Sequence, residues 1–567
     1  MKRTGAQTIW EALVAESVDV VFGYPGGAIM PAYDALPQYA IRHVLVRHEQ
    51  GAAHMADGYA RASGRCGVAV ATSGPGATNL VTGIATAMMD SSPVVFITGQ
   101  VPSTVLGTDA FQETDITGVT LPITKHNYLV TRVEDIYGTI REAFHLARSG
   151  RPGPVLVDIT KDAQQASMDF EHASPPQRPK KAPGHPPPEE RDLASAAQLI
   201  ESSERPLVLA GQGVQAGEAS GLLRELVEKA QLPVACTLLG LGAFPASHPL
   251  CVGMMGMHGE AWVNKAIQEA DLLIAVGMRF DDRVTGNLRT YAVNARKIHI
   301  EIDPSEINKN VKVDVPLCGE AAPILADLIP RVHNHDRRAW LDHLHEMSHD
   351  TKARDIVAQP HAVEALHAAH VMHDLWQETE GKALVVTDVG QHQMWEAQYY
   401  KHEQTRQLIT SGGLGTMGFA LPAGLGARFA RPNDDVWVIA GDGGFQMTAC
   451  ELSTCAQEGV KLNVAIINNG YLGMVRQWQE FFYSGRYVAT PIRSPDFVKL
   501  AEAHGLTGLR ATTRAEAREA MKRARSLPGT VVIDFRVEPE DSVYPMVPAN
   551  ADLRDMIRRP APKFVED

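Results

Sequence analysis

Gly441-Asp442-Gly443 and Asn468-Asn469 are the residues of this sequence whose types and spacing point most directly to chemistry. Each group follows a short apolar run, residues 436–440 and residues 464–467, of the kind that forms buried parallel strands. Because parallel sheets bind ligands at the carboxyl ends of their strands, we expect Asp442 and Asn469 to converge on one site. A carboxylate and an amide oxygen suit Mg²⁺, and the glycines let a backbone approach a phosphate. The pattern predicts a site for Mg²⁺ and a diphosphate.

Glu49 is the second candidate, because it follows the apolar run at residues 44–46 and precedes a helix-like segment at residues 50–61. A carboxylate at a helix N-terminus stabilises the helix by less than about 1 kcal/mol, and this helix-stabilising role is the simpler interpretation of Glu49 taken alone. Beside a bound heterocycle, the same carboxylate can shift the ring to its basic tautomer. Glu49 by itself leaves both roles open.

The elements that must position these residues are α/β units. Three blocks of the chain repeat an apolar run followed by glycines and a helix-length segment, at residues 68–76, 207–213 and 436–443. This repetition is typical of parallel βαβ units, so we predict an α/β protein with three open, mostly parallel α/β domains. A weak similarity between residues 73–76 and 411–415 indicates that the first and third domains share a fold.

Proline marks one domain boundary, since residues 174–188 contain seven prolines, too many for regular structure. A histidine-rich stretch at residues 331–374 marks the second boundary. Its histidines lack the fixed spacing of a metal site, and we interpret it as a linker plus a helix. The predicted division is a domain at 1–165, a Pro-rich linker at 166–190, a domain at 191–335, a connector at 336–360 and a domain at 361–567.

Composition excludes several function classes. The 567 residues hold 53 Lys and Arg against 66 Asp and Glu, and the net charge of −13 disfavours binding to nucleic acid or to an anionic membrane. No apolar run is long enough to cross a membrane, and acidic residues interrupt the segment where an export signal would lie. The six cysteines form no Cys-x-x-Cys motif, so we expect a reducing, cytoplasmic setting without disulfides or zinc.

Residues 413–418 fit the dinucleotide fingerprint Gly-x-Gly-x-x-Gly, but we reject that interpretation. The segment lacks an acidic residue at the expected distance after a second strand, and the fingerprint alone has a high false-positive rate. A different resemblance accounts for these glycines, and it starts from the Gly-Asp-Gly and Asn-Asn groups.

The Gly-Asp-Gly to Asn-Asn element resembles the thiamine diphosphate motif of thiamine-dependent enzymes. The resemblance implies that Asp442, Asn469 and the backbone oxygen of Tyr471 hold Mg²⁺, and that Glu49 activates the pyrimidine ring of the cofactor. Met417, in the glycine-rich segment, would hold the cofactor in a bent conformation. The first domain would bind the pyrimidine and the third the diphosphate, with further contacts from Gly390, Gln391, His392, Gly415, Gly443, Gly444 and Met474.

Nearly the whole chain is similar to the catalytic large subunit of the acetolactate synthase family, also called acetohydroxyacid synthase. The similarity rests on Tyr24-Pro25-Gly26-Gly27 and on residues 99–102, 108–114, 279–286 and 543–548. Biosynthetic members with the 279–286 motif bind FAD, which implies a largely structural flavin in the middle domain. Acids that end the strand at residues 298–300 can accept hydrogen bonds from a ribose. The implied FAD contacts are Arg151, His258, Arg279, Asp282, Arg283, Glu301, Asp303 and Glu320.

The resemblance implies a thiamine diphosphate-dependent carboligase. Pyruvate would lose CO₂ on the cofactor, and the hydroxyethyl carbanion would attack pyruvate or 2-oxobutyrate. The products, 2-acetolactate and 2-aceto-2-hydroxybutyrate, lead to the branched-chain amino acids. Gly27 and Gln112 match positions beside the reacting centre, and Trp478 matches a tryptophan credited with preferring 2-oxobutyrate. Gly444 departs from the family pattern, in which a serine is frequent.

The same resemblance has implications for how chains assemble. The family places Glu49 of one chain against the diphosphate site of another, which implies a homodimer or homotetramer with active sites between chains. About twenty residues follow Pro548, too few for a regulatory domain of roughly 50 residues, so feedback control would require a separate small regulatory subunit.

Three alternatives stay in view. A pyruvate oxidase or an oxoacid decarboxylase of the same architecture is the nearest, and residues 279–286 and the Trp478 segment disfavour it. A glyoxylate carboligase would lack the activating glutamate, which is present as Glu49. A non-catalytic nucleotide-binding protein would need disabled ligand positions, whereas Asp442 and Asn469 are intact.

Overall fold

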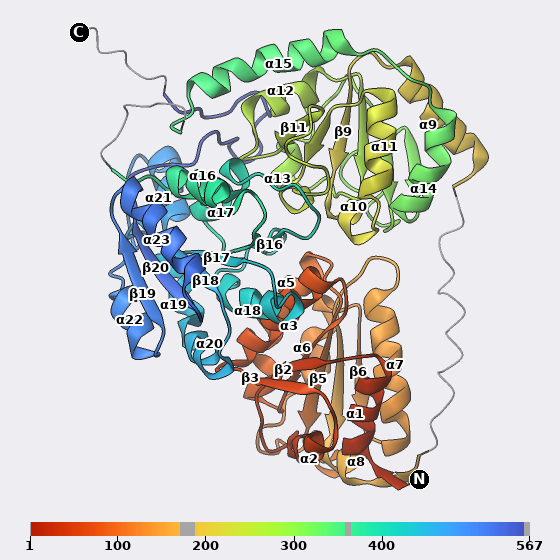
Figure 1. The fold of residues 1–567 in the computed structure, drawn as a ribbon. Helices are drawn as coiled ribbons and strands as arrows, with labels where there is room; N and C mark the ends of the chain where they lie inside the picture. The colour runs from red at the N-terminus through yellow and green to blue at the C-terminus, as the bar shows by residue number, and fades with distance from the viewer. Residues whose placement is uncertain (1, 171–187, 358–364, 561–567) are drawn as a thin grey trace.

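The computed structural model describes residues 2–170, 188–357 and 365–560, which form three α/β domains (Figure 1). Each domain is built on a six-stranded sheet in which neighbouring strands pair in parallel. The predicted fold class is therefore confirmed. In Figure 1 the first domain lies at the bottom, the middle domain at the top and the third domain at the left.

The first domain carries the strand order β3-β2-β4-β5-β7-β6. A separate antiparallel pair joins β1 (Lys2–Thr4) to β8 (Ser167–Asp169), and β8 falls in the stretch expected as a linker. The sheet consists of β2 (Val20–Gly23), β3 (Arg42–Leu45), β4 (Gly67–Ala71), β5 (Val94–Gln100), β6 (His126–Val130) and β7 (Val155–Thr160). Its main helices are α1 (Gly5–Ala15), α3 (Glu49–Ser63), α5 (Val81–Met89) and α7 (Val133–Arg148).

The third domain has the order β16-β15-β17-β18-β20-β19. Numbered within each domain, both orders are 2-1-3-4-6-5, so the first and third domains share a topology, as predicted. Its strands are β15 (Leu384–Thr387), β16 (Leu408–Thr410), β17 (Val436–Gly441), β18 (Asn463–Asn468), β19 (Thr507–Ala511) and β20 (Val531–Arg536). Its helices include α16 (Ala368–Thr379), α17 (Gln391–Tyr399), α18 (Ala420–Ala430), α19 (Asp442–Thr448), α20 (Leu452–Glu458), α21 (Gly473–Phe482), α22 (Phe497–Ala503) and α23 (Arg514–Ser526).

The middle domain differs in topology, with the order β11-β10-β9-β12-β13-β14. This is the 3-2-1-4-5-6 order of dinucleotide-binding folds, whose ligands bind where the order reverses, here between β9 and β12. The strands are β9 (Pro206–Ala210), β10 (Val234–Cys236), β11 (Cys251–Met254), β12 (Leu272–Val276), β13 (Arg296–Glu301) and β14 (Val315–Cys318). The helices include α9 (Glu190–Ser202), α10 (Gln212–Ala216), α11 (Ser220–Ala230), α12 (Ala261–Glu269), α13 (Asp282–Thr285) and α14 (Ala321–Leu328).

Two stretches connect the domains. Most of the predicted Pro-rich linker, residues 171–187, lies outside the described residues. The histidine-rich connector contains α15 (Arg338–Ala353), the helix expected there, which packs on the middle domain. Trp340 Nε1 donates to the carbonyl oxygen of Pro206 at 3.0 Å, and His343 Nε2 lies 2.8 Å from Glu269 Oε2. No helix in the described part of the chain is long and apolar enough to cross a membrane.

The C-terminal segment runs from the third domain back to the middle domain. Val547 N donates to the carbonyl oxygen of Met257, and Asn287 N donates to that of Ala551. The side chains of Val547 and Leu553 are buried in the middle domain's apolar core. Residues from the end of the chain therefore complete a domain that begins near residue 190.

Helices α3 and α18 hold the first and third domains together (Figure 1). The two helices contribute to one continuous apolar core that both domains share. Their backbones come so close that a Cβ added at Gly58 would lie 2.0 Å from the carbonyl oxygen of Ala423, and one at Gly426 would lie 1.9 Å from that of Met55. Only glycine permits this approach at these two positions.

Gly58→Ala is expected to destabilise the protein by roughly 1–3 kcal/mol, because the added methyl group meets backbone atoms that cannot move independently. Thermal unfolding should show a lower melting temperature. The matched control is Gly138→Ala, an exposed position in α7 with no atom within 4 Å of the added Cβ. That substitution should stabilise the helix by about 0.5–1 kcal/mol. Equal melting temperatures for the two variants would contradict the close approach.

Candidate functional site

The Gly-Asp-Gly and Asn-Asn groups meet at the carboxyl edge of the third domain's sheet. Strand β17 ends at Gly441 and α19 starts at Asp442, while β18 ends at Asn468. The two strands are paired neighbours, so Asp442 and Asn469 line the same small cavity of about 60 Å³. The other predicted residues around this cavity are Gly390, Gln391, His392, Met417, Gly443, Gly444, Tyr471 and Met474.

Neighbouring groups hold the two side chains that are predicted to be metal ligands. Asp442 Oδ2 accepts a hydrogen bond from Ser494 Oγ at 2.8 Å, and burial raises the pKa of this carboxyl to about 6. Asn469 Oδ1 accepts from Tyr471 N at 3.1 Å, and Asn469 Nδ2 donates to Gln391 Oε1 at 3.3 Å. The residues expected to bind Mg²⁺ therefore line one cavity and are each held by a neighbouring group.

The lining of the cavity fits an anionic diphosphate. His392 is buried, its Nε2 has no protein partner, and burial lowers the pKa of the imidazole to about 3. A Cβ added at Gly441 would lie 2.9 Å from His392 Cε1, and one at Gly473 would lie 2.1 Å from Gln391 Oε1. A side chain at either glycine would therefore displace His392 or Gln391, and a polar ligand would give His392 Nε2 its missing partner.

Asp388, which follows β15, is a residue that the sequence analysis missed. Its carboxylate accepts hydrogen bonds from Val389 N at 2.7 Å and from Gly418 N at 2.9 Å. Burial raises the pKa of this carboxyl to about 7, against the effect of the backbone donors. Asp388 thereby joins the loop of Gly390 to the loop of Met417. Its place at a strand end, directly before Val389-Gly390, was the available signal.

The residues predicted in the first domain gather at the carboxyl edge of its sheet. Glu49 is the first residue of α3, and its Oε2 accepts a hydrogen bond from Asn79 Nδ2 at 2.9 Å. Gln112 has a left-handed backbone with φ 60°, and a Cβ added at Gly74 would lie 2.8 Å from its carbonyl oxygen. Gly27 is exposed in the loop after β2. Within the described chain Glu49 lines neither this small cavity nor the larger one described next.

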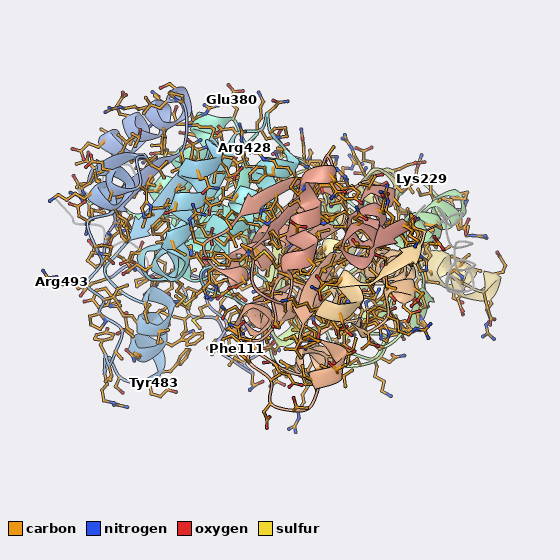
Figure 2. The ribbon with its side chains drawn as sticks, turned by 90° about the horizontal axis from the view of Figure 1, so that it is seen from below. Phe111, Lys229, Glu380, Arg428, Tyr483 and Arg493 are labelled. Atoms are coloured by element: carbon orange, nitrogen blue, oxygen red, sulfur yellow. The ribbon has the colours of Figure 1, made fainter. Side chains whose placement is uncertain are left out.

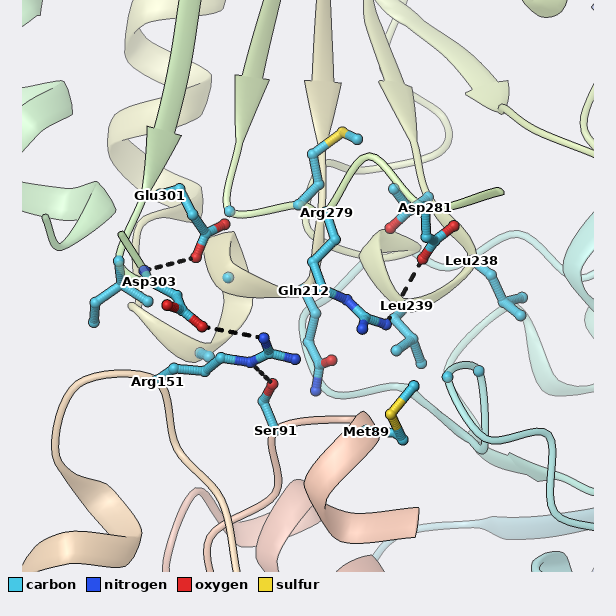
Figure 3. A pocket seen from close by; sticks show the side chains of 18 of the residues that line it. Met89, Ser91, Arg151, Gln212, Leu238, Leu239, Arg279, Asp281, Glu301 and Asp303 are labelled. Atoms are coloured by element: carbon cyan, nitrogen blue, oxygen red, sulfur yellow. Dashed lines mark hydrogen bonds and ion pairs between the residues drawn. The ribbon is translucent and has the colours of Figure 1, made fainter. Parts of the chain in front are cut away.

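A second cavity of about 1640 Å³ lies among the three domains (Figure 3). Gln212 and Gly213 after β9, and Gly277 and Met278 after β12, line it at the point where the strand order reverses. All the residues implied as FAD contacts line it as well: Arg151, His258, Arg279, Asp282, Arg283, Glu301, Asp303 and Glu320. Gly415 and Trp478 from the third domain also belong to its wall, and Trp478 is 38% exposed.

Arg151 crosses this large cavity from the first domain to the middle domain. Its Nε donates to Ser91 Oγ at 2.8 Å, and its NH1 lies 3.3 Å from Asp303 Oδ2 and 3.2 Å from Glu306 Oε1. Figure 3 shows Arg279 reaching into the same space from the middle domain. Burial raises the pKa of the Glu301 carboxyl to about 7. Arginines beside acids at a strand end fit a dinucleotide, with its diphosphate and ribose hydroxyls.

Three regions of the chain match families of thiamine pyrophosphate enzymes: the N-terminal TPP binding domain at residues 3–119, the central domain at 193–328 and the C-terminal TPP binding domain at 388–535. Acetolactate synthase large subunit IlvB1 of Mycobacterium tuberculosis is 49% identical, over 96% of this chain and 90% of that protein. This chain belongs to the acetolactate synthase family.

Other members of the acetolactate synthase family are similarly close. The acetolactate synthase large subunit of Corynebacterium glutamicum is 47% identical, over 98% of this chain and 90% of that protein. A probable acetolactate synthase large subunit of Methanocaldococcus jannaschii is 45% identical, over 98% and 95%. The resemblance drawn from the motifs and the prediction of a thiamine diphosphate-dependent enzyme are therefore confirmed.

Gly444 now has a physical reason for departing from the serine frequent in the acetolactate synthase family. A Cβ added at Gly444 would lie 3.0 Å from Cγ and Oδ2 of Asp388, and Asp388 is held in place by backbone amides. A side chain at residue 444 therefore requires a shift of the carboxylate that joins the two cofactor-side loops.

Gly444→Ser is expected to lower the stability of the protein by about 1 kcal/mol, because the Asp388 carboxylate must leave its amide donors partly unpaired. Differential scanning calorimetry of the variant measures this loss. Gly221→Ser in α11, an exposed position with no atom within 4 Å of the added Cβ, serves as the control and should leave the melting temperature unchanged. An unchanged melting temperature for Gly444→Ser would mean that Asp388 moves freely.

Proposed function

We propose that this protein joins two 2-oxoacids in branched-chain amino-acid biosynthesis. Pyruvate loses CO₂, and its remaining two-carbon unit is joined to pyruvate or 2-oxobutyrate, giving 2-acetolactate or 2-aceto-2-hydroxybutyrate. The observation that carries the proposal is the cavity that Asp442, Asn469 and His392 line together, in a chain of the acetolactate synthase family.

The proposal assigns Mg²⁺ and thiamine diphosphate to the small cavity. Asp442, Asn469 and the backbone oxygen of Tyr471 would hold Mg²⁺, and His392, whose Nε2 has no partner among the described residues, would lie against the diphosphate. When bound, thiamine diphosphate supplies the carbon nucleophile and the electron sink for decarboxylation. Met417, on a loop held by Asp388, would support the cofactor.

Glu49 has the proton-handling role in this proposal. Its Oε1 is free of protein partners in the described contacts, while Oε2 is held by Asn79. A carboxylate oriented in this way can hold the proton on a pyrimidine ring nitrogen and so keep that ring in its basic tautomer. Gly27 and Gln112 lie on loops at the same edge of the sheet, where they would contact the substrates.

FAD is assigned to the large cavity, with Arg151 and Arg279 near its diphosphate and Glu301 and Asp303 near a ribose. The reaction transfers no electrons overall, so the flavin has no redox step to perform. Arg151 already links the first and middle domains, and a dinucleotide in the same cavity would extend that link. The flavin's role would then be largely structural.

The proposal includes assembly into a homodimer or homotetramer, in which two chains contribute to each active site. Glu49 does not line the small cavity within the described chain, and in the proposed assembly a second chain would bring the two together. Phe111 is 87% exposed and Tyr483 is 57% exposed, and both, labelled in Figure 2, offer apolar surface for a contact between chains. Relatives named as large subunits support a separate small regulatory subunit, and the cytoplasm is the proposed location.

Purified protein with Mg²⁺, thiamine diphosphate and FAD is expected to form acetolactate from pyruvate without oxygen. Glu49→Gln should lower kcat by about 10²–10⁴-fold, because a neutral amide cannot hold the pyrimidine proton. A colorimetric acetolactate assay under anaerobic conditions measures both. Asp135→Asn, an exposed carboxylate in the first turn of α7, is the control and should retain full activity.

Other products would identify the alternatives. Oxygen-dependent formation of acetate or acetyl phosphate would make the protein an oxidase with a redox-active flavin. Acetaldehyde as the sole product would make it a simple decarboxylase. Full activity of Glu49→Gln would remove Glu49 from the mechanism.

Trp478 is expected to set the acceptor preference, because its partly exposed ring lines the large cavity where it meets the third domain. Trp478→Leu should reduce the preference for 2-oxobutyrate over pyruvate by roughly tenfold, since a wall that contacts one extra methylene contributes about 1–3 kcal/mol. Competition between the two acceptors, with both products quantified, measures the ratio. Phe482→Leu on the same helix, outside both cavities, is the control. An unchanged ratio in Trp478→Leu would assign the preference to other residues.

A further inference from the structure

Glu451 is a buried carboxylate that the proposed mechanism does not use. It ends the short helical turn Ala449–Glu451 in the third domain, and its side chain is fully buried. Its Oε1 accepts hydrogen bonds from the backbone N–H groups of Arg47 at 3.0 Å and His48 at 3.1 Å. These are the two residues directly before Glu49, so a carboxylate of the third domain fixes the backbone that leads into Glu49.

The contact is closely packed. Thr454 Oγ1 donates to Glu451 Oε2 at 2.6 Å and fixes the second oxygen. A Cβ added at Gly51, in the first turn of α3, would lie 2.4 Å from Glu451 Oε1. Glycine at residue 51 is therefore what lets the carboxylate lie against the start of α3. The carboxylate also lies near the positive end of that helix, where a negative charge is stabilised.

A second contact between the third and first domains, an ion pair near the surface, serves as a comparison. Glu458 is the last residue of α20, the helix that begins directly after Glu451. Its Oε2 lies 2.7 Å from Arg42 NH2 on β3. The Arg42 side chain is 53% exposed, and the ion pair touches no backbone atom near Glu49. Glu451 and Glu458 both join the two domains, but only Glu451 binds the backbone next to Glu49.

We infer that Glu451 is a positioning residue for Glu49. The carboxylate oxygens of Glu451 fix the N-terminus of α3 and thereby the location of the Glu49 side chain. The inference rests on the proposed role of Glu49. It also links the two halves of the site, because α19 starts at Asp442 and runs into the turn that ends at Glu451. The helical segment from Asp442 to Glu451 thus connects the carboxylate that would bind Mg²⁺ to the start of α3. Glu49, at that start, is the residue that the same chain would offer to its partner.

The test separates position from charge. Glu451→Asp keeps the charge but withdraws the oxygens by one methylene, whereas Glu451→Gln keeps an oxygen at the original reach and loses the charge. The readout is the rate at which the thiazolium carbon proton of thiamine diphosphate exchanges with deuterium in the Mg²⁺-loaded holoenzyme, followed by acid quench and proton NMR, per bound cofactor. In the proposed mechanism this exchange depends on Glu49, and it needs no substrate.

Glu451→Asp is expected to slow the exchange by on the order of tenfold, since small displacements of a catalytic group carry large rate penalties. Glu451→Gln should stay close to the wild-type rate, and Glu458→Gln, the matched control, should equal it. If Glu451→Gln is as slow as Glu451→Asp, or if neither variant changes the rate per bound cofactor while the melting temperature falls, the positioning role is overturned.

Glu49→Gln provides the reference. A large loss of exchange in Glu49→Gln together with unchanged Glu451 variants would leave the proposed function standing and overturn only the positioning role. Unchanged exchange in Glu49→Gln would overturn the proposed role of Glu49, and the inference on Glu451 with it.

Discussion

The contact between α3 and α18 is the constraint on which the rest of this structure depends. Two helices from different domains approach until backbone meets backbone at Gly58 and Gly426, and their apolar residues form one core. Because α3 starts at Glu49 and α18 follows the Met417 loop, this single interface fixes the relation between two groups of proposed site residues. Side chains at the ends of α3 and α18 can be placed accurately only because the helices cannot slide past each other.

The polar sites are built on this rigid arrangement by a recurring device. Buried carboxylates accept backbone N–H groups from loops that are distant in sequence: Asp388 binds the Met417 loop, and Glu451 binds the residues before Glu49. Arg61 is a donor instead of an acceptor. It is buried between Asp57 and Asp90, and it donates to the backbone carbonyl oxygen of Thr410. Each contact satisfies polar groups that would otherwise be buried without partners, and each fixes a loop at a strand end.

The sequence predicted the local units of the fold well and the long-range contacts poorly. An apolar run, a glycine turn and a helix are local features, so the three α/β blocks and the carboxyl edge that carries Asp442 and Asn469 could be predicted. Strand order depends on which strands pair across the domain, and nothing in the sequence distinguished the 3-2-1-4-5-6 order of the middle domain from the order of its neighbours. Asn79, Asp388 and Glu451 were missed because their roles arise from partners far away in the chain.

The return of the C-terminal segment to the middle domain has a consequence for synthesis. Val547 and Leu553 are buried in a core whose first strand forms near residue 206, so the middle domain lacks part of its interior until more than three hundred later residues have been translated. A ribosome-bound chain therefore exposes an apolar surface on that domain throughout elongation of the third domain. Translation and packing of the segment that holds Val547 and Leu553, rather than completion of the middle domain's own strands, is the step that closes this surface.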